Sequence, residues 1–349
     1  MNSWGNSCIM GGLRIADMFT LVTLLTLVAC RGVFSYPGGL KPGDQLKPAL
    51  RFIAVGDWGG LPLPPYVTPL EVATAKGMTR VAQTMGADFV LALGDNFYFT
   101  GVRSVDDPRF SETFESVYSA PELHIPWYVI AGNHDHKGNV SAQIAYSHRS
   151  SRWHFPDFYY DVVLPIPGSN ASLTLLMIDT ITMCGNTDDF GHGQPEGPED
   201  LELSNRQLKW LKEKLKAAKS EFVVVAGHFP VWSVAEHGPT HCLVKHLHPL
   251  LQKYQATAYF CGHDHNLQYL QETDSPIGYV LSGAGNFIDE SLKHKDAVPE
   301  DSLRFHFSDF ESLGGFVHVE VTKDIMTLTY IESLGKSLYR TTLPKRKRF

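Results

Sequence analysis

One local pattern recurs five times in this chain of 349 residues. A short apolar run ends in a glycine, and a carboxylate, amide or imidazole side chain follows. In the clearest instance, Val90–Leu93 leads to Gly94, Asp95 and, three residues further on, Tyr98. Such a run is typical of a strand buried on both faces, and in open α/β sheets the chemistry collects beyond the carboxyl ends of the strands. The pattern therefore predicts an α/β fold with its functional groups gathered at strand ends.

The five predicted strands lie at 51–55, 90–93, 126–131, 222–226 and 257–260. The side chains that follow them are Asp57, Asp95 with Tyr98, Asn133 with His134, His228, and His263 with His265. Each motif alone has an ordinary interpretation, such as a tight turn or a core histidine. Together they favour a metal site, because carboxylates can bridge two ions and a phenol becomes a good ligand only for a hard, strongly polarising cation.

The remaining pattern predicts the other elements. Helical spacing indicates helices at 71–85, 107–119, 140–149, 203–218 and 241–254, and further strands are expected at 158–164, 173–178, 279–281, 315–321, 326–330 and 337–341. The first helix joins two of the glycine-ended strands, which makes a parallel βαβ unit. Residues 182–200 are polar and rich in glycine and proline, and loops of this length inside a domain are usually functional lids or disordered segments.

Several features indicate the secretory pathway. Residues 1–35 have the pattern of a signal peptide, with Arg14 ahead of an apolar run at 18–29 that is short for a membrane span; a retained anchor is the alternative. Glycosylation sequons begin at Asn139 and Asn170. We expect residues 36–49 to be an irregular lead-in, 50–341 a single catalytic domain and 342–349 a solvated basic tail.

The cysteine count indicates one disulfide bond and one free thiol. Removal of the leader leaves Cys184, Cys242 and Cys261, an odd number. Cys261 ends an apolar run, so we expect it to be a buried free thiol and Cys184 to pair with Cys242.

With 43% apolar and 19% charged residues the chain is expected to be globular. We expect a monomer with no stable membrane span and no nucleic-acid binding.

The ordered motifs G-D-x-G, G-D-x-x-Y, G-N-H-D, V-x-G-H and G-H-x-H resemble those of the purple acid phosphatases, in the binuclear metallophosphoesterase superfamily. The match runs from about Arg51 to Thr341. This resemblance implies the calcineurin-like fold, a four-layer α-β-β-α sandwich of two mixed sheets flanked by helices. It also implies two iron ions, with Asp95 bridging them.

The resemblance assigns the other ligands by position. Fe(III) would be held by Asp57, Tyr98 and His265, and a divalent ion by Asn133, His228 and His263. Hard oxygen ligands suit Fe(III), whereas two imidazoles and an amide suit a softer ion. Gly59 stands where relatives with only divalent ions usually have histidine, and Tyr98 supplies the missing ligand. The divalent ion is iron in animal members and zinc or manganese in others, and the ligand types do not choose between these.

The activity that the resemblance implies is hydrolysis of phosphate monoesters, including phosphoproteins and nucleotides, by a metal-bound hydroxide at acid pH. His134 and His237 would protonate the leaving group, although a solvated loop is the alternative for His237. The loop at 182–200, with Asp188, would restrain activity until a protease cuts it. The implied location is lysosomal or secreted.

Three other functions are alternatives or additions. A divalent iron that changes oxidation state could generate reactive oxygen species as a side activity. A nucleotide phosphodiesterase is the main rival within phosphoesterases. A secreted signalling protein with a vestigial metal site is disfavoured, because all seven expected ligands are present.

Overall fold

Two mixed sheets form the centre of the computed structural model, which describes residues 47–187 and 194–347. The first sheet has the order β14-β13-β12-β1-β2-β3-β4. Its strands are β1 (Leu50–Val55), β2 (Phe89–Ala92), β3 (Trp127–Val129), β4 (Trp153–His154), β12 (Gly315–Val321), β13 (Ile325–Glu332) and β14 (Ser337–Pro344). Strands β1 to β4 are parallel, whereas β12, β13 and β14 join them antiparallel.

The second sheet has the order β11-β9-β10-β8-β7-β6-β5. Its strands are β5 (Tyr160–Pro165), β6 (Ser172–Met177), β7 (Phe222–Ala226), β8 (Ala258–Cys261), β9 (Leu267–Leu270), β10 (Gly278–Ser282) and β11 (Leu303–Phe307). The central strands β6, β7, β8 and β10 are parallel, and the outer strands β5, β9 and β11 are antiparallel. Each sheet thus has a parallel region in which the carboxyl ends of neighbouring strands share one edge.

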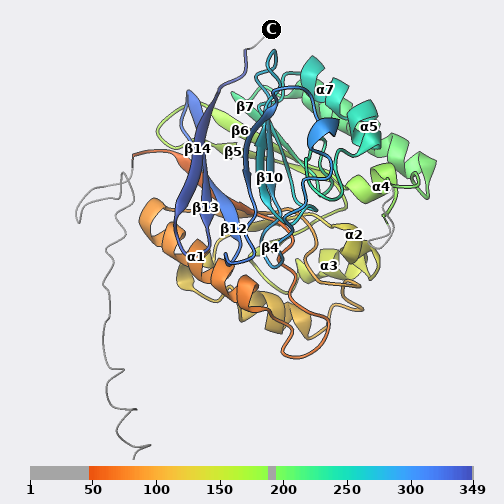
Figure 1. Ribbon diagram of the computed structural model, residues 1–349, viewed down its shortest axis with the longest axis vertical. Coiled ribbons are helices and arrows are strands. Elements are labelled where there is room, and N and C mark those ends of the chain that lie inside the picture. Colours follow the sequence, from red (N-terminus) through yellow and green to blue (C-terminus); the bar gives the residue numbers. More distant parts are fainter. Residues whose placement is uncertain (1–46, 188–193, 348–349) are drawn as a thin grey trace, which may run out of the picture. The chain divides into compact units, whose positions relative to one another are not determined.

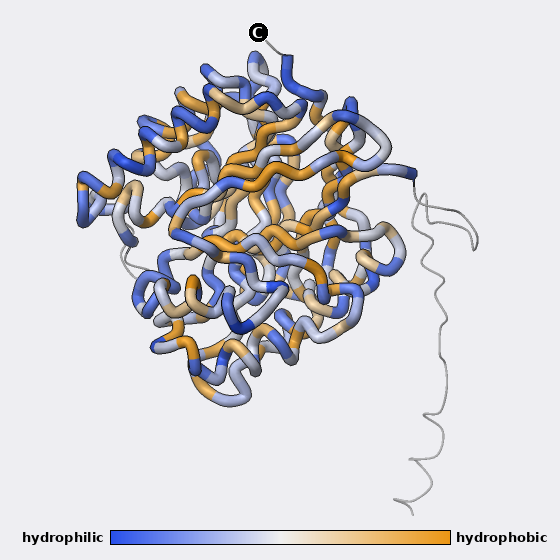
Figure 2. Tube along the Cα trace, turned by 180° about the vertical axis from the view of Figure 1, so that it is seen from behind, coloured by the Kyte–Doolittle hydropathy of each residue, from blue (hydrophilic) through white to orange (hydrophobic). Residues whose placement is uncertain are grey.

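The side chains of β7 explain why the sheets stack. Phe222, Val224 and Ala226 belong to a large core that also contains β1, β2, β12 and β13. Val223 and Val225 point the other way, into a second core with Leu211 and Leu215 of α5 (Leu201–Ala217). A strand covered on both faces must be apolar throughout, as the sequence of β7 is. Figure 2 shows the apolar residues running through these strands, between helices with polar outer faces.

Helices cover the two outer faces of the sheets (Figure 1). α1 (Pro69–Met85) begins with a capping box between Thr68 and Glu71 and buries Met78 and Val81 against the first sheet. The second sheet is covered by α5 together with α6 (His241–His246) and α7 (His248–Lys253). The layers are therefore helix, sheet, sheet and helix, which confirms the expected fold class.

Several expected boundaries were wrong. The helix expected at 107–119 is reduced to a π-helical segment, η2 (Phe110–Glu115). The helix expected at 241–254 is two helices, α6 and α7, because Pro249 has no N–H to continue the hydrogen-bond ladder. The helix expected at 140–149 is shorter, α3 (Val140–Tyr146). Strands β4, β9 and β11 were not predicted.

The shortest helices were missed as well. They are α2 (Asn133–His136), α4 (Thr180–Cys184) and the 3-10 segments η3 (Pro121–Leu123) and η4 (Lys295–Ala297). The helix α4 occupies the start of the loop expected at 182–200, because Asp179 caps its first turn by accepting from the backbone N–H of Thr182. Asp188 lies outside the described residues, as do the signal peptide expected at 1–35 and its apolar run at 18–29.

Arg346, in the expected basic tail, is less solvated than expected, whereas Lys345 and Lys347 are exposed. β14 continues to Pro344, and beyond it Arg346 is half-buried. Its guanidinium donates to the carbonyls of Ser220 (2.9 Å) and Ala218. The tail therefore attaches to the residues before β7 because its arginine satisfies backbone carbonyls there.

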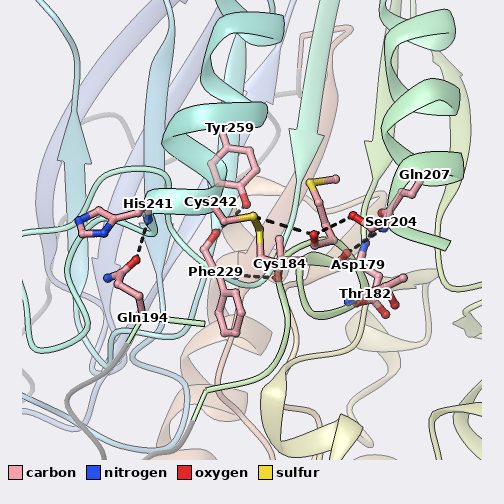
Figure 3. The surroundings of a disulfide bond; sticks show 12 residues. Asp179, Thr182, Cys184, Gln194, Ser204, Gln207, Phe229, His241, Cys242 and Tyr259 are labelled. Atoms are coloured by element: carbon pink, nitrogen blue, oxygen red, sulfur yellow. Dashed lines mark hydrogen bonds between the residues drawn. A yellow bond between two sulfur atoms is a disulfide. The ribbon is translucent and has the colours of Figure 1, made fainter. Parts of the chain in front are cut away.

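The disulfide between Cys184 and Cys242 confirms the expected pairing. Figure 3 shows that it joins the end of α4 to α6, beside Phe229 and Tyr259. Cys261 is a buried free thiol in β8, also as expected. Among the described residues, no helix is both long and apolar enough to cross a membrane.

Candidate metal centre

The five glycine-ended strands converge because they are neighbours within the two sheets. β1, β2 and β3 are adjacent and parallel, and so are β7 and β8. Backbone hydrogen bonds continue past the strand ends: Asp57 N–H donates to the carbonyl of Gly94 (3.0 Å), and Gly262 N–H donates to that of His228 (3.1 Å). The turns after these strands therefore lie side by side, and their side chains face one common space.

The glycines in these turns make room for neighbouring ligands. Gly94 has a φ of +90°, and a Cβ there would lie 2.7 Å from Nδ1 of His228. A Cβ at Gly132 would collide with the carboxylate of Asp95. A side chain at either position would thus force the ligand turns apart, which explains why apolar runs end in glycine here.

Three of the candidate ligands have left-handed backbone conformations. The φ angles are 58° for Asp57, 52° for Asp95 and 73° for His263. Non-glycine residues rarely adopt this conformation, and such strained positions cluster at functional sites. The sharp turn after each strand directs these side chains back over the sheet edge and toward one another.

One half of the centre is built around His228. Its Nε2 lies 2.9 Å from Oδ1 of Asn133 and 3.4 Å from Oδ2 of Asp95. Its Nδ1 donates to the carbonyl of Leu93 (2.9 Å), so in the neutral ring Nε2 has a free lone pair. A backbone carbonyl that fixes the tautomer is a common feature of metal-binding histidines. Ligand atoms of Asp57, Asp95 and His228 all lie within 4.8 Å of one another.

The other half contains Tyr98. Its hydroxyl donates to Oδ1 of Asp57 (3.0 Å) and lies 3.0 Å from Nε2 of His265. Nε2 of His265 is 3.6 Å from the same oxygen of Asp57. Arg109 donates to the carbonyl of Tyr98 (2.7 Å) and so fixes the turn. Tyr98, Asp57 and His265 thus bring one phenol, one carboxylate and one imidazole together.

His263 lies between these groups. Its backbone N–H donates to Oδ2 of Asp57 (2.8 Å), and its ring centroid is 5.1 Å from that of His228. The structure therefore brings together all seven residues that the sequence suggested as ligands.

The surroundings of these groups shift their pKa values away from the ordinary ones. Burial raises the pKa of Asp57, and burial together with Asp57 and Asp95 raises that of Tyr98. Burial opposes ionisation of Asp95 too, but His228 and His134 outweigh it and hold its pKa low. Burial and the nearby His237 lower the pKa of His265 to about 3.

These shifts fit a site for cations. In the described part of the chain, Asp57 and Asp95 form ion pairs with histidines only. Buried carboxylates need positive charge. Burial opposes protonation of His228, but Asp95 and Asp57 outweigh it and raise its pKa to about 9, so the ring supplies that charge here. A bound cation would supply the charge instead and leave the ring neutral, with the lone pair of Nε2 as a ligand. The donor set of oxygen and imidazole ligands suits two metal ions.

The two candidate proton donors lie beside the ligands. His134 is buried; its Nδ1 donates to the carbonyl of Phe99 (2.8 Å) and its Nε2 is 3.8 Å from Oδ2 of Asp95. His237 is half-buried, and its ring stacks on His263 with centroids 4.1 Å apart. The fully solvated loop considered for His237 is therefore not observed.

Sequence reasoning missed two buried carboxylates that support the centre. Asp135 accepts from the backbone N–H groups of Gly132 (2.8 Å) and Asn96 (3.0 Å), so it joins two ligand turns. Asp264 accepts from the backbone N–H of His237 (2.9 Å). Both follow a candidate site histidine directly within the motifs G-N-H-D and G-H-D-H, and that position was the available signal.

The loop that contains Asp188 contacts a candidate ligand at one described end and the segment after His237 at the other. Asn186 donates to the carbonyl of Asn133 (3.3 Å). Gln194 accepts from the backbone N–H of His241 (2.6 Å; Figure 3) and donates to the carbonyl of Pro239 (3.0 Å). The sequons lie elsewhere: Asn139, which caps α3, and Asn170, between β5 and β6, are both exposed.

The chain is similar to known proteins. Residues 50–267 match the family described as calcineurin-like phosphoesterase. Tartrate-resistant acid phosphatase type 5 of Homo sapiens is 59% identical over 306 residues, which cover 87% of this chain and 94% of that protein. The chain belongs to the calcineurin-like phosphoesterase family.

More distant proteins are similar to the chain as well. Purple acid phosphatase 4 of Arabidopsis thaliana is 30% identical over 340 residues, covering 93% of this chain and 94% of that protein. The solved structure of GAP50, described as the anchor in the inner membrane complex of Plasmodium, has a TM-score of 0.73 at 23% identity and covers 86% of this chain and 90% of its own. That likeness shows the fold alone. The curated relatives confirm the resemblance to purple acid phosphatases and the class of the enzyme, an acid phosphatase.

Proposed function

We propose that this protein hydrolyses phosphate monoesters at a binuclear Fe(III)–divalent centre. Asp57, Tyr98 and His265 would hold Fe(III); Asn133, His228 and His263 would hold the divalent ion; and Asp95 would bridge them. The observation that carries the proposal is the Tyr98 hydroxyl, which lies 3.0 Å from both Asp57 Oδ1 and His265 Nε2. A buried phenol with a raised pKa is deprotonated there only by a hard cation.

When bound, the two ions would polarise the phosphate and activate the water that attacks phosphorus. The chain's residues have separate roles. Asp95 holds a negative charge between the two sets of ligands, since its pKa is low even when buried. The N–H of His134 donates to Asp95 Oδ1 (3.0 Å) and so orients this carboxylate.

The leaving alkoxide needs a proton, and His134 and His237 are the candidate donors. Nδ1 of His134 is committed to the carbonyl of Phe99, so only Nε2 is available for proton transfer. The ring of His237 stacks on that of the candidate ligand His263. Both candidate donors would therefore lie beside an ester bound at the centre.

The visible absorption spectrum, combined with metal analysis and a phosphatase assay, tests this proposal. We expect two iron ions per chain, a purple tyrosinate-to-Fe(III) band that becomes pink after one-electron reduction, and hydrolysis of phosphomonoesters at acid pH. A colourless protein with two zinc or manganese ions would remove the ferric assignment. A metal-loaded protein without phosphatase activity would overturn the proposed function.

Substrate preference separates this function from that of a nucleotide phosphodiesterase. We expect phosphomonoesters, including nucleotides and phosphoproteins, to be hydrolysed faster than the corresponding diesters. An oxidative side activity also depends on the divalent ion. If it is iron, we expect production of reactive oxygen species that stops when zinc replaces it while hydrolysis continues, since zinc does not change oxidation state.

We also propose that the loop at 182–200 restrains activity until a protease cuts it. Its described ends support this idea, because Asn186 contacts the backbone of Asn133 and Gln194 contacts the segment after His237. Asp188 would supply the restraining side chain. Asp188→Ala should raise the activity of the uncut enzyme, and an uncut variant with unchanged activity would contradict this role.

The proposed location is the secretory pathway, with lysosomal or secreted enzyme as the product. Residues 1–35 would be removed as a signal peptide, leaving the lead-in at 36–49 and the catalytic domain from 50 to 341, and the enzyme would be a monomer. Exposure of Asn139 and Asn170 would permit glycosylation. Mass spectrometry of the secreted protein would identify the new N-terminus and the glycosylated asparagines.

A further inference from the structure

Residues 227–240 connect β7 to α6 without forming a helix or a strand. This connecting segment contains His237, and most of it is buried. Buried backbone groups outside regular structure need other hydrogen-bond partners. The partners of this segment therefore determine where His237 lies.

A buried polar network supplies several of them. Asp264 accepts from the backbone N–H of His237 through Oδ1 (2.9 Å) and from the hydroxyl of Ser233 through Oδ2. Gln268 donates to Oγ of Ser233 (2.8 Å) and accepts from the N–H of Val234 (3.0 Å). Ser233, Asp264 and Gln268 have no exposed surface. Because each member restrains the next, the network fixes the backbone at Val234 and at His237.

The network also links His237 to the ligand turn. Asp264 lies in sequence between His263 and His265, so the carboxylate that holds the backbone of His237 belongs to the turn that presents those two imidazoles. The stacking of His237 on His263, with 29° between the ring planes, follows from this shared support.

We propose that Ser233, Asp264 and Gln268 are positioning residues that hold His237 where it protonates the leaving group. The inference rests on the proposed function of His237 as a proton donor. Ser233 is the best probe because its hydrogen bonds in the described part of the chain are with Asp264, Ala235 and Gln268, none of which is a candidate ligand. Asp264 is a poorer probe, because its replacement would disturb the ligands beside it.

The test is a double-mutant cycle in the metal-loaded enzyme with Ser233→Ala, His237→Ala and the double variant. Two esters are compared: glycerol phosphate, whose alkoxide needs a proton to leave, and 4-nitrophenyl phosphate, whose phenolate does not. We expect Ser233→Ala to lower kcat on glycerol phosphate by roughly 10-fold, part of the 10²–10⁴-fold that a general acid contributes, and on 4-nitrophenyl phosphate by less than about twofold.

In the His237→Ala background, Ser233→Ala should have no further effect on kcat, because the two residues act through one group. Metal content must stay at the wild-type value in every variant. The control is Ser220→Ala, which removes a buried hydrogen-bonded serine that precedes β7, at the opposite end of that strand, and should leave both rates unchanged. If Ser233→Ala does not fold, Gln268→Glu provides the second variant, since it keeps an acceptor for Val234 and removes the donor to Ser233.

Equal slowing of both esters by Ser233→Ala, or full additivity with His237→Ala, would overturn the inference while leaving the phosphatase function intact. Unchanged hydrolysis of glycerol phosphate by His237→Ala would overturn the inference together with its premise about His237. Absence of hydrolysis of either ester by the metal-loaded wild type would instead reject the proposed function, and the inference with it.

Discussion

The hydroxyl of Tyr98 lies 3.0 Å from Nε2 of His265, although 167 residues separate them in the chain. The two residues follow strands of different sheets, β2 and β8. Their contact therefore depends on the stacking of the two sheets with their strand ends on the same side. The site therefore depends both on the local turns that follow the strands and on the packing of one sheet against the other.

Tyr98→Phe should remove the visible band and weaken retention of Fe(III) while the fold persists. The phenylalanine ring keeps the packing that Tyr98 makes against Phe287, with centroids 4.8 Å apart. Only the phenol oxygen is lost, and with it the hard ligand for Fe(III). Absorption spectra and iron analysis after dialysis check this prediction. A variant that keeps the purple colour would show that Tyr98 is not the chromophore.

Asp135→Asn should lower metal affinity by about 10–100-fold, the usual effect of removing a group that orients ligands. The carboxylate accepts from the backbone of Gly132 and Asn96 and from the side chain of Gln143 (2.8 Å), and an amide replaces one acceptor oxygen by a donor. Competition with a chelator measures the affinity. Asp324→Asn, at an exposed ion pair with Lys345, is the control and should change nothing.

Replacement of Cys184 and Cys242 by alanine should lower the free energy of unfolding by about 4 kcal/mol, by the chain-entropy relation for the loop that the bond closes. The two cysteines are 58 residues apart. Denaturant unfolding with and without reductant provides the measurement, since the wild type should become less stable on reduction and the double variant should not. Cys261→Ala is the matched control: it retains the bond, so its stability should still fall on reduction.

The stability of the fold should decrease in acid partly through His318, which lies in β12 and far along the chain from the ligands. Burial lowers its pKa to about 4, although its Nε2 donates to the carbonyl of Gly86 (2.9 Å). Because the unfolded chain has the higher value of about 6.5, it binds the proton more readily. The contribution of the neutral His318 ring to the free energy of unfolding is therefore complete above pH 6.5 and is lost as the pH falls toward 4. At pH 5 the free energy of unfolding should be lower by about 2 kcal/mol from this group.

Comparison with His318→Gln isolates this effect. Glutamine can still donate to Gly86 but does not titrate, so the variant should lose less stability between pH 7 and 5 than the wild type. Denaturant titrations of both proteins at the two pH values provide the comparison. Equal losses in the two proteins would exclude His318 as a source of acid sensitivity.

The ligand turns could be predicted because their signal is local. A strand buried on both faces must be apolar, and a turn crowded by other ligands must contain glycine, as Gly94 and Gly132 do. The pairing of Cys184 with Cys242 also followed from counting cysteines and from the apolar run around Cys261. Weak local signals failed: the helix expected at 241–254 is divided near Pro249, and the two-residue strand β4 has no distinct pattern.

The sequence by itself determined which residues end the strands and what chemistry they offer, because strand burial and turn geometry act within a few residues. Only the tertiary structure decided how His237 is held and where Arg346 attaches. Asp264 lies 27 residues from His237, and Ser220 lies 126 residues from Arg346. Such bonds form wherever folding leaves a buried polar group in need of a partner, and no spacing along the chain records them.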